Sequence, residues 1–172
     1  MKVEFHPSTA GDVNEGASFG LRTELMVFHG KWYDEVKVGE SFGDSLTVTE
    51  THLVLAAGMF GDFNPLHVDE EFAKQSRFGG RILHGPFTSA LVSTSVGMYF
   101  AGTAIAYVEH KCRFKTPVRP GDTLNTRWTV VEKLDKPKHR GGIIVMRGEA
   151  KNQNGEVAVA ADGKILVASR PS

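Results

Sequence analysis

The sequence predicts an α+β domain in which an antiparallel sheet wraps around one central helix. An early strand is expected over 42–48, and a helix begins at Pro86 and continues to about Met98. Strands that follow one another in the chain usually pair as antiparallel hairpins and so form one sheet. The helix that precedes them should then pack on one face of this sheet. These later strands, which alternate or are rich in β-branched residues, are expected over 105–114, 123–131, 143–150 and 157–167.

The chain between the first strand and the central helix is predicted to be partly helical. Thr49 can cap a short helix that should end at one of the next two glycines. The stretch 62–85 then predicts a loop interrupted by Pro65, a short helix capped by Asp69, and a second loop. Such a long irregular insert is uncommon in a compact domain and is usually functional.

The central helix is predicted to place its larger side chains on one face, with serine and glycine on the others. Small residues on several sides predict a helix that other elements approach closely. The residues expected on the main face are Phe87, Ala90, Leu91, Thr94 and Met98. The turn signals expected between the later strands are Pro120-Gly121-Asp122, Gly141-Gly142 and Asn154-Gly155.

The length of 172 residues suits a single domain. The 20 Lys and Arg residues balance the 20 Asp and Glu residues, so no net charge attracts nucleic acid or an anionic membrane. We therefore expect neither of these partners. Cys112, the only cysteine, excludes an internal disulfide and a cysteine-rich metal site. We expect it to be a core thiol in a reducing compartment, the cytoplasm.

Residues 1–30 show no sustained periodicity and are predicted to be an N-terminal extension of a domain over 31–172. The first residues carry charges and turn formers where a signal peptide has its apolar run, so export is not expected. The uncharged stretch 82–108 is long enough to cross a bilayer. It is poor in large apolar residues and is broken by glycine and proline, so a buried helix followed by a strand explains it better.

The segment GDFNPLH brings a carboxylate, an amide and an imidazole together as Asp62, Asn64 and His67. A carboxylate and a histidine that share one water can act as base and acid and add it across a double bond. Asn64 could orient that water or brace the loop. Asp and Asn also bond their own backbone in ordinary turns, so the spacing alone leaves both interpretations open.

His84-Gly85-Pro86 forms a second polar feature, at the start of the central helix. The free backbone N–H groups and the positive end of the helix dipole suit a developing oxyanion, and Gly85 lets a substrate approach the backbone. However, Gly-Pro often simply begins a helix, and a histidine such as His84 is more often structural than catalytic. The dipeptide alone favours the structural interpretation.

Both features belong to one longer motif, GDFNPLHVDEEFAKQSRFGGRILHGPFTSAL. It resembles the signature of the MaoC-like dehydratases and (R)-specific enoyl-CoA hydratases, which have the hotdog fold. The resemblance covers about residues 31–168 and implies reversible hydration of trans-2-enoyl thioesters to (R)-3-hydroxyacyl thioesters. Asp62 and His67 then correspond to the catalytic pair, and Asn64 to their support. The amide of Gly85 corresponds to the donor that binds the thioester oxygen.

No metal or redox cofactor is expected, because a helix N-terminus and an Asp/His pair supply the charges that this reaction needs. His52, His67 and His84 can be imagined as metal ligands together with Asp62. Their spacing matches no known metal-binding pattern, however.

Two other functions stay open. A hotdog thioesterase would bind the same thioester carbonyl, but it usually has a carboxylate on or near the central helix, and 86–98 contains no Asp or Glu. A non-catalytic acyl-thioester-binding subunit would lack the acid and the base, whereas Asp62, Asn64 and His67 are all present.

The expected substrate is a thioester of coenzyme A or of an acyl carrier protein. Because hotdog domains pair edge strands across a two-fold axis, the resemblance also implies a homodimer or a multiple of dimers. Four basic residues near the expected mouth of the site can meet the phosphates of coenzyme A: Lys74, Arg77, Arg81 and Lys115.

Overall fold

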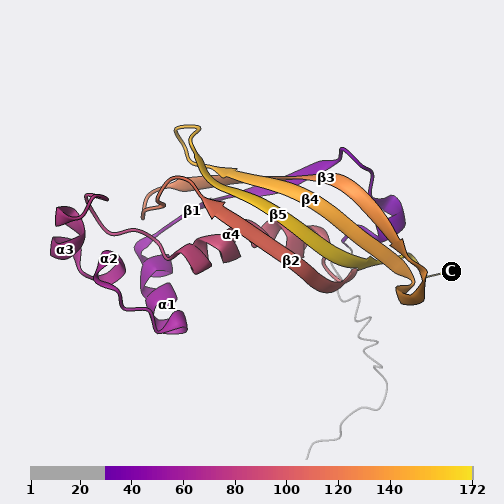
Figure 1. Ribbon diagram of the computed structural model, residues 1–172, viewed down its shortest axis with the longest axis horizontal. Helices are drawn as coiled ribbons and strands as arrows, with labels where there is room; N and C mark the ends of the chain where they lie inside the picture. Colours follow the sequence, from indigo (N-terminus) through magenta and orange to yellow (C-terminus); the bar gives the residue numbers. More distant parts are fainter. Residues whose placement is uncertain (1–29, 172) are drawn as a thin grey trace, which may run out of the picture.

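The computed structural model describes residues 30–171 and shows a five-stranded antiparallel sheet curved around the long helix α4 (Figure 1). The short helices α1, α2 and α3 lie together at one end of the sheet. Apart from Gly30, the predicted extension 1–30 lies outside the described residues. The elements are η1 (Tyr33–Glu35), β1 (Ser41–Thr47), α1 (Glu50–Phe60), α2 (Pro65–Val68), α3 (Glu70–Gln75), α4 (Gly85–Tyr99), β2 (Ala104–Phe114), β3 (Thr123–Lys136), η2 (Pro137–His139), β4 (Gly141–Lys151) and β5 (Val157–Ala168).

The strand order in the sheet is β1-β3-β4-β5-β2, so β1 and β2 are its two edges. Every neighbouring pair is antiparallel, with β3–β4 and β4–β5 as hairpins. The sheet is tied to the helix by Trp128, which is fully buried and donates from Nε1 to the Val92 carbonyl oxygen at 3.0 Å. Opposite Trp128, a Cβ on Gly148 would lie 2.7 Å from the indole ring. The glycine therefore gives the indole room to lie flat on the sheet, and the predicted α+β layout is confirmed.

The buried face of α4 differs from the predicted one. Its buried residues follow helical spacing toward the sheet, and they are Thr88, Val92, Ser95 and Val96. Of the predicted face, Phe87 and Leu91 pack only partly against the core, whereas Ala90, Thr94 and Met98 are exposed. The prediction was wrong because a helix with small residues on several sides has no dominant apolar stripe, so that packing against the sheet decides which face is buried.

The insert after α1 contains one more helix than predicted. Pro65 does not interrupt the chain but begins α2, and Asn64 caps this helix by accepting the Leu66 N–H at 3.0 Å. Proline suits the first helical position, where its missing N–H costs no hydrogen bond. Asp69 caps α3, as predicted, by accepting the Phe72 N–H at 3.0 Å.

The Gly141-Gly142 pair is not the turn that was predicted. Strand β3 continues to Lys136, the chain turns through η2 and Arg140, and the two glycines begin β4. A Cβ on Gly142 would lie 2.3 Å from the Tyr33 ring. Close packing, rather than a turn, therefore requires glycine at this position.

The remaining boundaries follow the sequence. Helix α1 begins after Thr49 and ends at Gly61, whose φ of +66° is the left-handed conformation that glycine adopts without strain. The uncharged stretch 82–108 supplies α4 and most of β2, and no helix within residues 30–171 has the length and apolar character to span a bilayer. Cys112 is only half-buried against the core, where desolvation raises the pKa of its thiol.

Candidate active site

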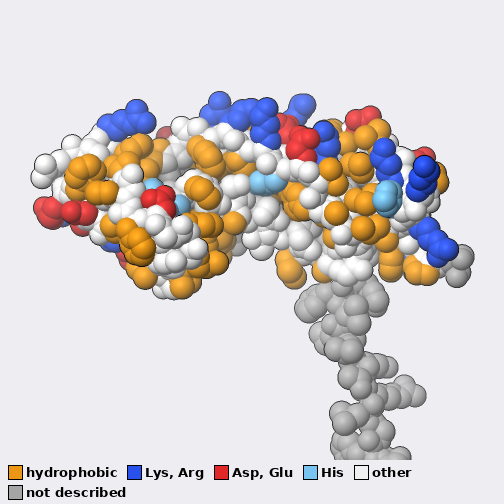
Figure 2. All heavy atoms as spheres, turned by 60° about the horizontal axis from the view of Figure 1, so that its bottom comes forward, with side chains coloured by type: hydrophobic (Ala, Val, Ile, Leu, Met, Phe, Trp, Pro, Cys, Tyr) orange, Lys and Arg blue, Asp and Glu red, His pale blue; other side chains and the backbone are white. Residues whose placement is uncertain are grey.

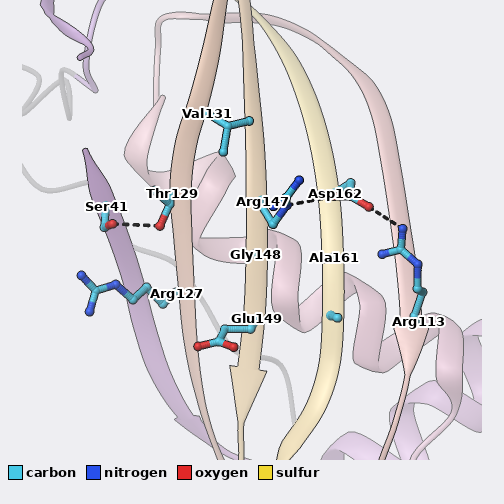
Figure 3. Close-up of a pocket in the computed structure, with 11 residues that line it drawn as sticks. Ser41, Arg113, Arg127, Thr129, Val131, Arg147, Gly148, Glu149, Ala161 and Asp162 are labelled. Atoms are coloured by element: carbon cyan, nitrogen blue, oxygen red, sulfur yellow. Dashed lines mark hydrogen bonds and ion pairs between the residues drawn. The ribbon is translucent and has the colours of Figure 1, made fainter. Parts of the chain in front are cut away.

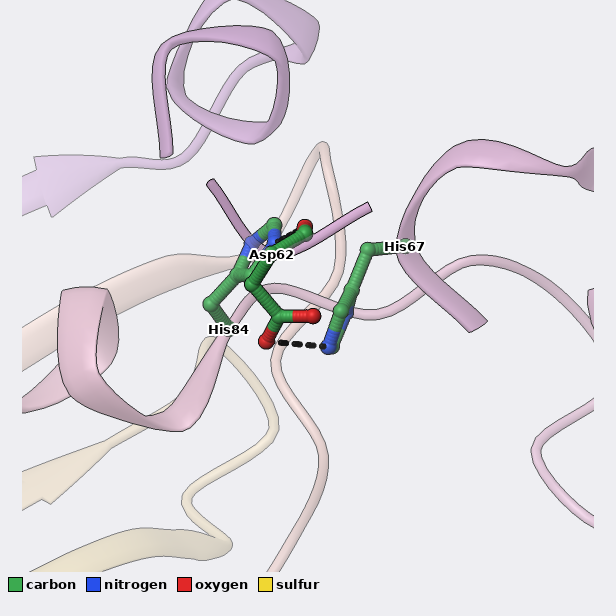
Figure 4. A group of neighbouring side chains, drawn as sticks. All are labelled: Asp62, His67 and His84. Carbon is green, nitrogen blue, oxygen red and sulfur yellow. Dashed lines mark hydrogen bonds and ion pairs between the residues drawn. The ribbon is translucent and has the colours of Figure 1, made fainter. Parts of the chain in front are cut away.

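Three polar side chains converge where α1, α2 and the start of α4 meet (Figure 4). Asp62 lies in the loop directly after α1, His67 lies on α2, and His84 is the residue before the first turn of α4. The left-handed Gly61 and the Asn64-Pro65 cap direct this loop, so the local sequence determines where the carboxylate and the first imidazole lie.

Asp62 and His67 face one another without a direct hydrogen bond. Asp62 Oδ2 lies 3.9 Å from His67 Nε2, which is beyond hydrogen-bond range. His67 Nδ1 donates to the Ile82 carbonyl oxygen at 2.7 Å, which fixes the ring and directs Nε2 toward the carboxylate. At this separation one water can bond to both groups. The geometry therefore suits the shared water that the sequence analysis anticipated.

His84 holds both members of this pair in place. Its side chain is completely buried, and Nε2 donates to the Asp62 carbonyl oxygen at 2.8 Å. Its ring stacks on that of His67, with centroids 3.8 Å apart and an angle of 26° between the planes. The sequence favoured a structural role for His84, and this geometry makes it a positioning residue for Asp62 and His67.

Asn64 braces the loop. Its side-chain oxygen caps α2, and its backbone N–H donates to Asp62 Oδ1 at 3.2 Å. This contact occupies one carboxylate oxygen and leaves the other facing His67. Of the two roles considered for Asn64, bracing the loop is the one that these hydrogen bonds support.

Gly85 lies beside His67 in a cavity of about 320 Å³. As the first residue of α4, it has a backbone N–H with no partner within the helix. Pro86 has no N–H to offer, so the next such donor is that of Phe87. The cavity is lined by His67, Arg77, Phe78, Ile82, Leu83, Gly85, Thr88, Phe114, Lys115, Thr116, Pro117 and Val118.

Two of the four basic residues named from the sequence border this cavity, namely Arg77 and Lys115. The other two are engaged in ion pairs. Arg81 bonds Glu70 and Glu50, and Lys74 bonds Glu71. Arg77 and Lys115 are therefore the basic groups available to an anionic ligand at the cavity.

The Asp62, His67 and His84 side chains each bring a possible metal-ligand atom to within 4.8 Å of the others. The stacked imidazoles do not favour a tetrahedral ion, because their nitrogen lone pairs lie in nearly parallel planes rather than pointing at one centre. His84 Nδ1 is buried and has no hydrogen-bond partner. His52 lies outside this group, and its Nδ1 accepts the Thr49 N–H at 3.0 Å at the start of α1. The arrangement fits proton transfer better than metal binding.

A larger hollow of about 830 Å³ lies on the face of the sheet opposite α4 (Figure 3). There Asp162 pairs with Arg113 at 2.7 Å and faces Arg147 at 3.9 Å. None of the predicted site residues borders this hollow. Its size alone therefore does not identify it as the site, and Asp62 and His67 remain the candidate site.

The part of the chain that contains this candidate site matches a known protein family. The model of the MaoC-like domain matches residues 35–151, which include the loop, α2 and α4. The chain belongs to the MaoC-like domain family. The resemblance seen in the motif is thereby confirmed, and the MaoC-like region contains every predicted site residue.

Two relatives of this MaoC-like chain match over most of their length. The (R)-specific enoyl-CoA hydratase of Rhodospirillum rubrum is 32% identical over 138 residues, which cover 76% of this chain and 94% of the relative. The 3-hydroxybutyryl-CoA dehydratase of Methylorubrum extorquens is 30% identical over 135 residues, which cover 74% and 84%.

Solved structures agree with the hotdog architecture. An R-hydratase from Pseudomonas aeruginosa, in the unliganded form, has a TM-score of 0.72 and 32% identity, covering 81% of this chain and 86% of that one. The MaoC-like dehydratase from Rhodospirillum rubrum has a TM-score of 0.72 and 28% identity, covering 83% and 100%. The predicted hotdog fold is confirmed.

Proposed function

We propose that this protein is a hydro-lyase that reversibly hydrates trans-2-enoyl-CoA to (R)-3-hydroxyacyl-CoA. The observation that carries the proposal is the Asp62–His67 pair, which is spaced for one shared water and whose His67 lines the same cavity as Gly85. The names of the hydratase and dehydratase relatives support it.

The chemistry requires a proton acceptor, a proton donor and an oxyanion donor. As the water oxygen bonds to C3, the pair takes one proton from the water, and the electrons of the double bond move toward the thioester oxygen. The Gly85 N–H, at the positive end of α4, stabilises this developing charge. The pair then returns one proton to C2, so that it ends in its starting state and the elements of water have been added.

Coenzyme A is the carrier that the surroundings of the cavity favour. Arg77, in the turn after α3, and Lys115, directly after β2, both border the cavity that contains Gly85. Their positive charges can pair with the phosphates of coenzyme A. The acyl chain would then extend from the thioester in the other direction, along α4.

The proposal is tested by mixing the protein with crotonyl-CoA and trans-2-hexenoyl-CoA and following the loss of the conjugated enoyl-thioester absorbance. We expect hydration to the (R)-3-hydroxyacyl product, with no added metal and with no loss of rate in a chelator. Release of free coenzyme A thiol would indicate a thioesterase instead. Binding without conversion would indicate a non-catalytic subunit.

Gly85→Ala is expected to fold and to raise KM for the enoyl thioester while keeping part of the turnover. The backbone at Gly85 does not have a positive φ, and an added Cβ would meet the Phe114 ring at 3.4 Å. The amide donor is retained, so crowding of the substrate is the main effect. Gly97→Ala is the matched control, because a Cβ there, on the same helix, meets nothing within 4 Å. Unchanged KM and turnover in a folded Gly85→Ala protein would show that the thioester does not lie against this turn.

We also propose a homodimer formed through the edge strand β2. Two irregularities in its pairing with β5 accompany the exposed apolar residues Ile105 and Val108. Hydrophobic side chains also gather over the helical end of the molecule, where Met59 and Phe63 are 72% and 64% exposed (Figure 2). An exposed apolar edge strand is a common site of pairing with another chain.

Light scattering at micromolar concentration should therefore give twice the chain mass of 18.8 kDa, or a multiple of it. Ile105→Lys should shift the protein toward monomer, because it places a charge in the proposed interface. Leu46→Lys on the other edge strand is the control and should not. A parent protein that is mainly monomeric would contradict the proposal.

A further inference from the structure

A second cavity, of about 240 Å³, lies between α4 and the edge strand β2. One of its lining residues, Pro86, directly follows Gly85, so the cavity lies one residue along α4 from the proposed position of the thioester. The residues that line it are Pro86, Ser89, Ala90, Ser93, Tyr107 and His110. None of these six is an acid, a lysine or an arginine, in contrast to the cavity that contains Arg77 and Lys115.

Two polar side chains, Tyr107 and His110, line the strand side of this cavity, and a third, Cys112, contacts His110. Tyr107 Oη lies 2.9 Å from His110 Nδ1, and His110 Nε2 lies 3.1 Å from Cys112 Sγ. The pairing of β2 with β5 is irregular between Tyr107 and Glu109, and this brings Tyr107 to the same face as His110. The Tyr107 hydroxyl lies above Gly163, where a Cβ would be 3.3 Å from its oxygen. The absence of a side chain on Gly163 therefore makes room for this hydroxyl.

On the helix side of the cavity, the Ser93 hydroxyl already donates its hydrogen to another group and can act only as an acceptor for a ligand. Ser93 Oγ donates to the Ala90 carbonyl oxygen at 2.8 Å, so its lone pairs remain for a ligand. Tyr107 can likewise donate to His110 Nδ1 and present its own lone pairs. Burial lowers the pKa of His110 and raises the pKa of Tyr107 to about 12, so neither adds a charge at neutral pH. The walls thus present hydrogen-bond acceptors and no cation.

We propose that this cavity binds the distal part of the acyl group and selects an acyl chain that carries a hydroxyl. This inference rests on the proposed hydratase function. A hydroxyl can donate to Ser93 or Tyr107, whereas a terminal methyl leaves their lone pairs unpaired and a carboxylate meets acceptors with no balancing charge. From Gly85, Ser89 lies about 6 Å and Ser93 about 12 Å along the helix axis, so the hydroxyl belongs at the end of a short to medium chain.

The test compares kcat/KM for trans-2-hexenoyl-CoA, its 6-hydroxy derivative and the corresponding chain that ends in a carboxylate. The same three end groups are then compared on an eight-carbon chain. A single hydrogen bond is worth about 1 kcal/mol, so we expect about a fivefold preference for the hydroxyl over the methyl at one of the two lengths. The carboxylate should be the poorest substrate. Equal or better use of the methyl-ended chain at both lengths would overturn the proposal.

Two variants test whether the preference for the hydroxyl-ended chain arises in this cavity. Tyr107→Phe and Ser93→Ala should each lower the ratio of kcat/KM for the hydroxyl-ended chain to kcat/KM for the methyl-ended chain, because each removes an acceptor for the hydroxyl. Thr94→Ala is the matched control, because Thr94 also donates to the Ala90 carbonyl but does not line the cavity. A preference that survives in both variants would place the hydroxyl elsewhere and refute the inference.

The two proposals fail in different ways. If the parent hydrates hexenoyl-CoA without any preference for the hydroxylated chain, the hydratase function stands and only the selectivity is wrong. If none of the six thioesters is hydrated, the hydratase function is wrong, and the inference that rests on it fails too.

Discussion

Asp62→Asn and His67→Gln are each expected to lower the turnover of crotonyl-CoA by about 10² to 10⁴-fold, the usual contribution of a positioned acid or base. The two groups lie 3.9 Å apart, and a water bonded to both loses its orientation when either is changed. KM should change much less than turnover, because the thioester is held by other parts of the site. Steady-state kinetics on each variant measure both quantities.

The double variant should be little worse than either single variant, because groups that act as one unit do not contribute independently. Asp69→Asn is the matched control for the carboxylate, since the Asp69 carboxylate lies in the same insert and caps α3 by accepting the Phe72 N–H. Thermal melts establish that each variant is folded. Near-parent turnover in either single variant would show that Asp62 and His67 are not the catalytic pair.

The sequence predicted the fold wherever a residue has a strong local conformational preference. Gly61 ends α1 because glycine adopts a left-handed backbone freely, and Asp69 caps α3 because its carboxylate can bond the next turn. The alternating strands could be located for the same reason. The buried face of α4 and the role of Gly142 could not, because both depend on residues distant in the sequence, such as Trp128 and Tyr33.

The candidate site shows the same division. Asp62 and His67 are brought together by five residues of local chain, so their proximity could be predicted from a loop with a proline-initiated turn. His84 lies 17 residues beyond His67, and only the folded insert stacks the two rings. A histidine directly before the first turn of the helix was a visible signal, but nothing in the sequence indicated its partner. The cavity between α4 and β2 also depends on an irregular pairing of β2 with β5 beside Tyr107. The alternation of residues in the sequence does not reveal this irregularity.

His84 is therefore expected to matter for catalysis although it need not touch the substrate. His84→Phe keeps a ring to stack on His67 but removes the N–H that holds the Asp62 carbonyl oxygen at 2.8 Å. Displacement of a reacting group by about 1 Å can cost about 10² in rate, so we expect a loss of that order in kcat. KM for the enoyl thioester should stay close to the parent value. The freed backbone oxygen should also lower the free energy of unfolding by about 1 to 3 kcal/mol.

Two further variants distinguish a positioning role of His84 from a purely structural one. Val96→Ala, on the sheet-facing side of the same helix, should lower stability through lost packing and leave kcat and its pH profile unchanged. His84→Gln can restore a donor to the Asp62 carbonyl, so it should recover part of the kcat that His84→Phe loses. Its pH profile should also lie closer to that of the parent, because the profile reports the Asp62–His67 pair. If His84→Phe keeps parent kcat, or if Val96→Ala loses as much kcat at equal stability, His84 does not position the pair and its burial serves the fold alone.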